Sequence, residues 1–340
     1  MKIAILGAGG IGGYYGGMLA RARHDVHVLA RGTNLAALQQ KGLEIRTPEE
    51  SFIVRVTASD EVKQFGCVDF AIVAVKAYSL AEIAPAARHL AQEGALILPL
   101  LNGVDISDRM VELGVPADKV LGGITTISAV RIAPGVFERR SKFQEVIVGE
   151  FRDPNVADRN DGGRMQRVAS IVQAFRDTKV EARVSADIQA DIWRKFAFIA
   201  SLAAACGLAR SPVGTLRNTP LGRLLVERAI REVVTVGRAR GIGLGQDEAD
   251  RILKFCDTLP DTMKPSLLLD LEAGRPTEID DLSGAVSKIG RLAGVETPIH
   301  DTAVAALSAA QHEGKRPSGA GLNRDGSSFE QQRSTVNASK

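Results

Sequence analysis

The chain has little cysteine and few aromatic residues for its length. Three of its 340 residues are cysteines, and Phe, Trp and Tyr together make up 4%. Cys67, Cys206 and Cys256 lie far apart and form no CxxC pair, which argues against a disulfide-stabilised secreted domain. We therefore expect a reduced, cytoplasmic location, and we expect no metal site.

The sequence also lacks an excess of charge and any long apolar run. Its 43 basic and 40 acidic residues give a net charge of +3, and the two signs are interspersed, which argues against a nucleic-acid-binding surface. No uncharged apolar run reaches the roughly 18 residues of a membrane-spanning helix, and the first residues resemble a strand rather than a signal peptide. We expect a small-molecule partner, without nucleic acid or membrane.

The remaining composition is ordinary for a folded protein of two domains. The chain is 45% hydrophobic and 24% charged, and its length suffices for two separate cores. In the first third, short apolar runs alternate with segments of helical period, which is typical of an α/β fold of the Rossmann type with a mostly parallel sheet. The predicted strands span residues 2–6, 25–29, 70–75, 95–99 and 119–126, and an antiparallel pair at 135–138 and 145–149 is expected at the sheet edge.

The pattern changes near Ser185. Residues 187–205 read as one long helix, and helical periodicity continues to Gln311, so we expect an all-α domain after the α/β domain. The final residues are rich in Gly and Ser and hold few large apolar side chains, too few to offset the entropy of ordering. The predicted divisions are 1–184 for the α/β domain, 185–312 for the helical domain and 313–340 for a disordered tail.

A glycine-rich loop follows the first predicted strand and opens a predicted helix. It fits GxGxxG, in which the first glycine permits a tight turn, the second lets the backbone approach a pyrophosphate, and the third lets helix and strand pack closely. The helix N-terminus supplies free N–H groups to the anion. The alternative is an incidental glycine-rich turn; the position behind a strand favours a dinucleotide site formed by Gly7, Ala8, Gly9, Gly10, Ile11 and Gly12.

Arg31 follows the second predicted strand, where an NAD-binding enzyme is expected to carry Asp or Glu. A guanidinium there suits the 2′-phosphate of NADP(H), to which it can make paired charge-assisted hydrogen bonds. The alternative is a solvated loop arginine. Lys76 and Asn102 come just after two further strands, at the sheet edge where ligands bind, although each could equally be a solvated loop residue.

Lys195 stands at the start of the apolar part of the long helix, where an ammonium group is costly unless it is paired or lines a wet cavity. The alternative is a side chain that extends to solvent along its apolar stem. Downstream, Thr277 is expected to cap a helix whose first turn contains Glu278, so Glu278 has capping chemistry as its simpler explanation.

These motifs occur in an order that resembles the ketopantoate reductase (2-dehydropantoate 2-reductase) family over about residues 1–311. The resemblance implies NADP(H) as cofactor, with Arg31 and Lys76 at the 2′-phosphate end and Ala129 along the cofactor. It implies that Asn102 contacts nicotinamide and substrate. It assigns Lys195 as the general acid, Glu278 as the residue that orients it near the nicotinamide ribose, and Ser266 as a contact of the substrate carboxylate.

The chain departs from the family pattern at two positions. The family usually has asparagines four and eight residues after the catalytic lysine, which bind the hydroxylated end of the substrate, and here these are Ile199 and Ala203. A pocket without hydrogen-bonding groups cannot select for a hydroxyl. The resemblance therefore implies 2-dehydropantoate or a close, more apolar 2-oxo acid as substrate.

The expected chemistry is hydride transfer to a 2-oxo acid with proton donation by Lys195, because a charged amine can stabilise and then neutralise the developing alkoxide. Two other functions stay open: a 3-hydroxyacid or opine-type dehydrogenase, and a non-catalytic module that senses the NADPH to NADP ratio. The apolar helical domain also favours a homodimer.

Overall fold

A five-stranded parallel sheet forms the centre of the first half of the protein. The computed structural model describes residues 1–151 and 162–313, so the predicted tail lies outside the described residues except for Glu313, the last residue of a helix. The strand order is β5-β2-β1-β6-β7, and every pair is parallel. The strands are β1 (Lys2–Leu6), β2 (Asp25–Leu29), β5 (Thr57–Ser59), β6 (Phe70–Val73) and β7 (Leu96–Pro99).

Helices cover both faces of this sheet, which confirms the predicted Rossmann-type fold. Alternate residues of β1 enter different cores: Ile3 and Ile5 pack beneath one face, whereas Ala4 and Leu6 pack beneath the other. The period-2 side-chain alternation of a strand produces this division. The covering elements are α1 (Gly10–Arg21), α2 (Gly32–Lys41), α3 (Leu80–Gln92), α4 (Ile106–Glu112) and the short 3₁₀ helices η1 (Val62–Phe65), η2 (Ala77–Ser79) and η3 (Ala117–Lys119).

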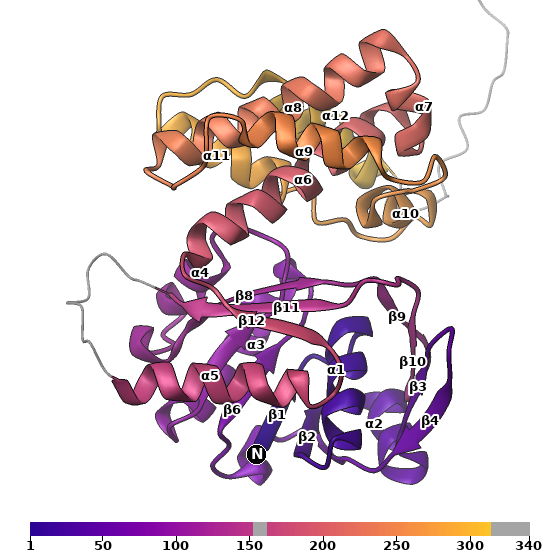
Figure 1. The fold of residues 1–340 in the computed structure, drawn as a ribbon. Helices are drawn as coiled ribbons and strands as arrows, with labels where there is room; N and C mark the ends of the chain where they lie inside the picture. Colours follow the sequence, from indigo (N-terminus) through magenta and orange to yellow (C-terminus); the bar gives the residue numbers. More distant parts are fainter. Residues whose placement is uncertain (152–161, 314–340) are drawn as a thin grey trace, which may run out of the picture.

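Two smaller sheets flank the central one. The first has the order β4-β3-β10-β9 and the second β12-β11-β8; α5 packs on β11 and β12 in the second (Figure 1). Their bounds are β3 (Leu43–Arg46), β4 (Ser51–Val54), β9 (Ala129–Ala133), β10 (Val136–Arg139), β8 (Leu121–Thr126), β11 (Glu145–Glu150), β12 (Glu181–Val184) and α5 (Gly162–Arg176).

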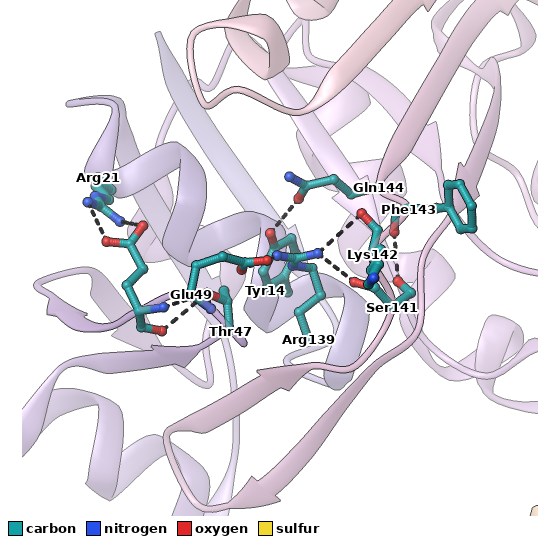
Figure 2. A network of polar contacts seen from close by, with 10 residues as sticks. Tyr14, Arg21, Thr47, Glu49, Arg139, Ser141, Lys142, Phe143 and Gln144 are labelled. Atoms are coloured by element: carbon teal, nitrogen blue, oxygen red, sulfur yellow. Dashed lines mark hydrogen bonds and ion pairs between the residues drawn. The ribbon is translucent and has the colours of Figure 1, made fainter.

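The predicted antiparallel pairing of segments 135–138 and 145–149 is wrong. β10 pairs with β3 and β9, whereas β11 pairs with β8 and β12. The segment between them crosses from one sheet to the other and is fixed by polar contacts: Arg139 binds Glu49 and the carbonyls of Ser141 and Lys142, and the Tyr14 hydroxyl donates to Gln144 (Figure 2). Alternation in the sequence identifies a strand but not its partner.

The second half of the protein is helical and is organised around α6 (Ile188–Ala209). Asp187 caps this helix by accepting a hydrogen bond from the backbone N–H of Ala190. Figure 1 shows α6 rising from the strands into the helical layer. α6 is the one helix in the described ranges long and apolar enough to cross a membrane, but 61% of its apolar window is buried within the fold. Around it lie α7 (Val213–Arg217), α8 (Pro220–Ala239), α9 (Glu248–Asp257), α10 (Ser266–Glu272), α11 (Ser283–Leu292) and α12 (Pro298–Glu313).

The helix expected to begin at Thr277 begins instead at Ser283. The Thr277 hydroxyl accepts from the N–H of Ile279, two residues onward, and residues 279–282 form turns. Local side-chain bonds of this kind compete with helix formation. The turn, rather than a helix, therefore carries Glu278.

Ile188 joins the two halves at the start of α6. It is 4% exposed and packs with Ile124 and Ile147. A Cβ atom on Gly122 of β8 would lie 2.5 Å from the Ile188 side chain, and one on Gly149 of β11 would lie 2.6 Å from it. The two glycines thus allow the first turn of α6 to sit directly on the small sheet.

We expect Ile188→Ala to lower the free energy of unfolding by about 2–5 kcal/mol, because the buried side chain leaves a cavity between rigid strands. Urea denaturation followed by circular dichroism measures this. Val184→Ala, on the exposed side of β12, is the control and should change stability by no more than about 0.5 kcal/mol. If both variants lost the same free energy of unfolding, the close packing of Ile188 against Ile124 and Ile147 would be contradicted.

Candidate active site

The glycine-rich loop connects β1 to α1 as predicted from the sequence. Gly7 has φ of 112°, a conformation that favours glycine. A Cβ on Gly12 would lie 2.1 Å from the Gly7 carbonyl oxygen, and one on Gly10 would lie 2.1 Å from the carbonyl oxygen of Ala129 on β9. The first turn of α1 carries no acidic residue and no side-chain cap. Its N–H groups are therefore available to an anion.

A buried asparagine that the sequence analysis did not single out supports this loop. Asn34, in the first turn of α2, is 6% exposed. Its side chain donates to the carbonyl of Ala8 at 3.5 Å and accepts from the N–H of Gly135 at 2.8 Å. It thereby ties the glycine loop to the β9–β10 turn. No sequence pattern marks this role.

Arg31 lies at the end of β2 and precedes the first residue of α2. Its side chain is 69% exposed, and its guanidinium forms an ion pair of 2.6 Å with Glu82 of α3. Such exposed pairs contribute little stability. The cation stays accessible from solvent beside the glycine loop.

Lys195 and Asn102 come together from different halves of the protein. The Lys195 Nζ donates a hydrogen bond of 3.0 Å to Asn102 Oδ1. Asn102 follows β7, and Gly103 after it has φ of 135°. The direct partner of Lys195 is thus Asn102, whereas the sequence resemblance implied that Glu278 orients it.

Glu278 binds the loop after β6 instead. Its Oε2 accepts from Lys76 Nζ at 2.9 Å, and its Oε1 accepts from the backbone N–H of Ala77 at 3.1 Å. Asp270 of α10 lies on the other side of Lys76, with Oδ2 at 3.3 Å from Nζ. Lys76 therefore bridges the two halves; its contact with a 2′-phosphate stays a prediction.

The two lysines have opposite pKa shifts. Burial lowers the pKa of Lys195 to about 8, and the charge of Glu278 opposes this only in part. Burial also lowers the pKa of Lys76, but the adjacent carboxylates of Glu278 and Asp270 outweigh it and the net shift is upward. Lys195 can therefore gain and lose a proton near neutral pH, whereas Lys76 stays charged.

A small recess opens beside Lys195. Its walls are mainly apolar and include Ile199. Ala203 does not line this recess and is 2% exposed within the helical core. Ser266, the first residue of α10, is exposed and does not line the recess either. A second small recess adjoins it and shares Leu101, Gly103, Gly123 and Ile192. The first is lined by Leu101, Asn102, Gly103, Gly123, Ile124, Ile192, Lys195, Phe196 and Ile199.

This arrangement can act on a carbonyl compound. A titratable amine lies at the wall of an apolar recess, close to the carboxyl edge of a parallel sheet and to a glycine loop suited to a pyrophosphate. In the described ranges, no group of three or more His, Cys, Asp or Glu side chains is arranged to hold a metal ion.

Comparison with known proteins gives matches along nearly the whole described chain. Residues 3–153 match the family described as "Ketopantoate reductase PanE/ApbA", and residues 187–311 match its C-terminal counterpart. An "Uncharacterized oxidoreductase YkpB" from Bacillus subtilis is 30% identical over 90% of this chain and 98% of its own length. A 2-dehydropantoate 2-reductase from Halobacterium salinarum is also 30% identical, over 92% of this chain and its whole length.

A solved structure agrees with these sequence matches. A ketopantoate reductase of the same family from Ralstonia eutropha superimposes with a TM-score of 0.81 and 25% identity, covering 93% of this chain and all of its own.

We expect competitive labelling with acetic anhydride, analysed by mass spectrometry, to give half-maximal reactivity of Lys195 near pH 8. Glu278→Gln should move the titrations of Lys195 and Lys76 to lower pH, since both lose a stabilising negative charge. Glu272→Gln is the matched control, because that carboxylate binds Lys264. An unchanged Lys195 titration in Glu278→Gln would contradict the electrostatic coupling.

Proposed function

Because the chain belongs to the ketopantoate reductase family of oxidoreductases, we propose that it reduces a 2-oxo acid to a 2-hydroxy acid with NADPH. The proposed substrate is 2-dehydropantoate or a close and more apolar analogue. The observation that carries this proposal is the position of Lys195, a titratable amine held 3.0 Å from Asn102 at the wall of the recess.

The residues around the glycine loop fit NADPH. Gly10 packs directly against the Ala129 carbonyl, which holds the loop on β9, and the α1 N-terminus suits a pyrophosphate. Arg31, in place of the acidic residue of NAD enzymes, would bind the 2′-phosphate together with Lys76. When bound, this cofactor supplies the hydride.

Lys195 would supply the proton. Hydride addition to the substrate's keto carbon moves the carbonyl π electrons onto oxygen, and the ammonium group of Lys195 stabilises that charge and transfers a proton to it. The product is the 2-hydroxy acid, and the neutral amine then regains a proton from water. Asn102 orients the amine, the charge of Glu278 favours its protonated form, and Ser266 is proposed to contact the substrate carboxylate.

The recess favours an apolar substrate end. Ile199, Leu101, Ile124 and Phe196 offer no hydrogen bond to a substrate hydroxyl. A substrate hydroxyl placed against them would lose its bonds to water. We therefore propose that this pocket selects a 2-oxo acid with a branched, unhydroxylated side chain.

We further propose that residues 1–184 form the NADP(H)-binding domain and residues 185–312 the substrate domain. A cytoplasmic location and a homodimer stay predictions from composition.

We expect Lys195→Ala to lower kcat/KM for 2-oxo acid reduction by about 10²–10⁴-fold, the typical contribution of general acid catalysis. NADPH binding, measured by fluorescence titration, should change little. In the unmodified protein kcat/KM should fall as the pH rises above about 8, because the donor must be protonated. Lys264→Ala, which removes an amine paired with Glu272, is the control.

Full activity in Lys195→Ala would overturn the proposed mechanism. If neither protein reduces any 2-oxo acid while both bind NADPH, the NADP-sensing module is favoured. A panel of 3-hydroxy acids and of amino acid plus keto acid pairs tests the other dehydrogenase types.

We expect Ile199→Asn to shift the substrate preference toward 2-dehydropantoate. The matched probe is trimethylpyruvate, which is 2-dehydropantoate with its hydroxyl replaced by hydrogen. An asparagine amide that bonds the hydroxyl should raise the ratio of the two kcat/KM values, 2-dehydropantoate over trimethylpyruvate, by about tenfold or more. Ile199→Val, which keeps the wall apolar, should leave the ratio unchanged; an equal ratio in all three proteins would show that position 199 does not face the substrate.

A further inference from the structure

Arg109 joins the two halves of the protein beside the candidate active site. It lies on α4, the helix that follows the Asn102 loop. Its NH1 is 2.7 Å from Asp281 Oδ1, and its NH2 donates to the carbonyl oxygen of Ala77 at 3.2 Å. The side chains of Arg109 and Asp281 are 29% and 14% exposed, respectively. This is a partly buried ion pair, not one between freely solvated side chains.

The backbone of Ala77 links this ion pair to Glu278. The N–H of Ala77 donates to Glu278 Oε1, while its carbonyl accepts from Arg109. Glu278 and Asp281 lie three residues apart in one turn, and Leu282 donates its N–H to the Glu278 carbonyl within that turn. Lys76 holds one end of the turn through Glu278, and Arg109 holds the other through Asp281.

Arg109 also separates carboxylates that repel one another. Asp105, at the end of the active-site loop, lies 3.8 Å from the guanidinium. Burial raises the pKa of Asp105, Arg109 lowers it and the charge of Asp281 raises it. Lys288 of α11 also lowers the pKa of Asp105, and the charge of Asp105 in turn raises the pKa of Asp108 of α4. Removing the guanidinium would leave Asp105 and Asp281 facing each other, which favours movement of the Glu278 turn away from α4.

We propose that Arg109 is a positioning residue of the reductase, which fixes the turn that carries Glu278 through Asp281 and the backbone of Ala77. Its consequence for the reaction rests on the proposed function, because that function makes Lys195 the proton donor. Arg109 does not touch the recess: neither recess includes it. It acts on the amine only through the turn that carries Glu278.

The variants that test this are Arg109→Gln and Asp281→Asn, each assayed by acetic anhydride labelling of Lys195 across pH. Both should move the Lys195 titration to lower pH, in the same direction as Glu278→Gln and by a smaller amount, since the carboxylate is displaced rather than removed. Arg109→Lys should restore part of the shift, because an ammonium can still pair with Asp281. The double variant should shift Lys195 no further than either single variant.

The matched control is Arg231→Gln. Arg231 also pairs with two carboxylates, Glu227 and Asp250, but all three lie within the helical half. This variant should leave the Lys195 titration unchanged. With trimethylpyruvate and NADPH, Arg109→Gln should move the alkaline limb of the kcat/KM profile by the same amount as the labelling curve.

A purely structural ion pair gives a different result. If Arg109→Gln and Asp281→Asn lower the midpoint of urea denaturation but leave the Lys195 labelling curve at its original pH, the inference is overturned. If Arg109→Gln does not fold, the milder Asp281→Asn decides the question alone. Labelling requires no substrate, so a shift there supports the positioning role even if Lys195→Ala shows that the proposed reaction is wrong.

Discussion

The carboxylate of Glu278 acts on two lysines in different ways. It bonds directly to Lys76, whereas it acts on Lys195 only through its charge. Burial disfavours the charge on both amines, yet among the described residues Lys76 has two carboxylates within hydrogen-bond reach and Lys195 has none. Direct contact decides the sign of the pKa shift: a bonded carboxylate outweighs burial, whereas a more distant one does not. Lys76 therefore stays charged, whereas Lys195 can titrate. The turn that carries Glu278 acts on both lysines, and the difference between them comes from direct contact with Lys76.

The fold places these groups at one edge for simple reasons. Lys76 and Asn102 follow β6 and β7, whose carboxyl ends lie side by side because the strands are parallel. α6 reaches that edge from the other half because Gly122 and Gly149 leave room for Ile188. A larger residue at either glycine would displace the first turn of α6, and with it Lys195 two turns later. The amine's position thus depends on close packing of backbone against side chain as well as on its own hydrogen bond.

The sequence predicts the parts of this site that depend on local patterns. The glycine loop after β1, the long helix from Asp187 and the parallel sheet all have short-range signatures, and the structure and family comparison confirm the fold and the family. The pairing of β10 with β3, the pairing of β11 with β12 and the roles of Asn34 and Arg109 depend on contacts across 26 or more residues. Such contacts leave no periodic pattern. The residues assigned by resemblance to contact cofactor or substrate stay predictions.

The two departures from the family pattern do not carry equal weight. Ile199 lines the recess beside Lys195, but Ala203 lies one turn further along α6, 2% exposed within the helical core. An asparagine at 203 would place an amide among apolar side chains, at a cost of about 1–3 kcal/mol unless it found a partner there. Alanine at 203 therefore needs no explanation in terms of substrate, because it follows from tight packing of α6 against its neighbours. Under the proposed function, selection for or against a hydroxylated substrate then falls on position 199, where an apolar side chain lines the recess and offers a substrate hydroxyl no partner in place of water.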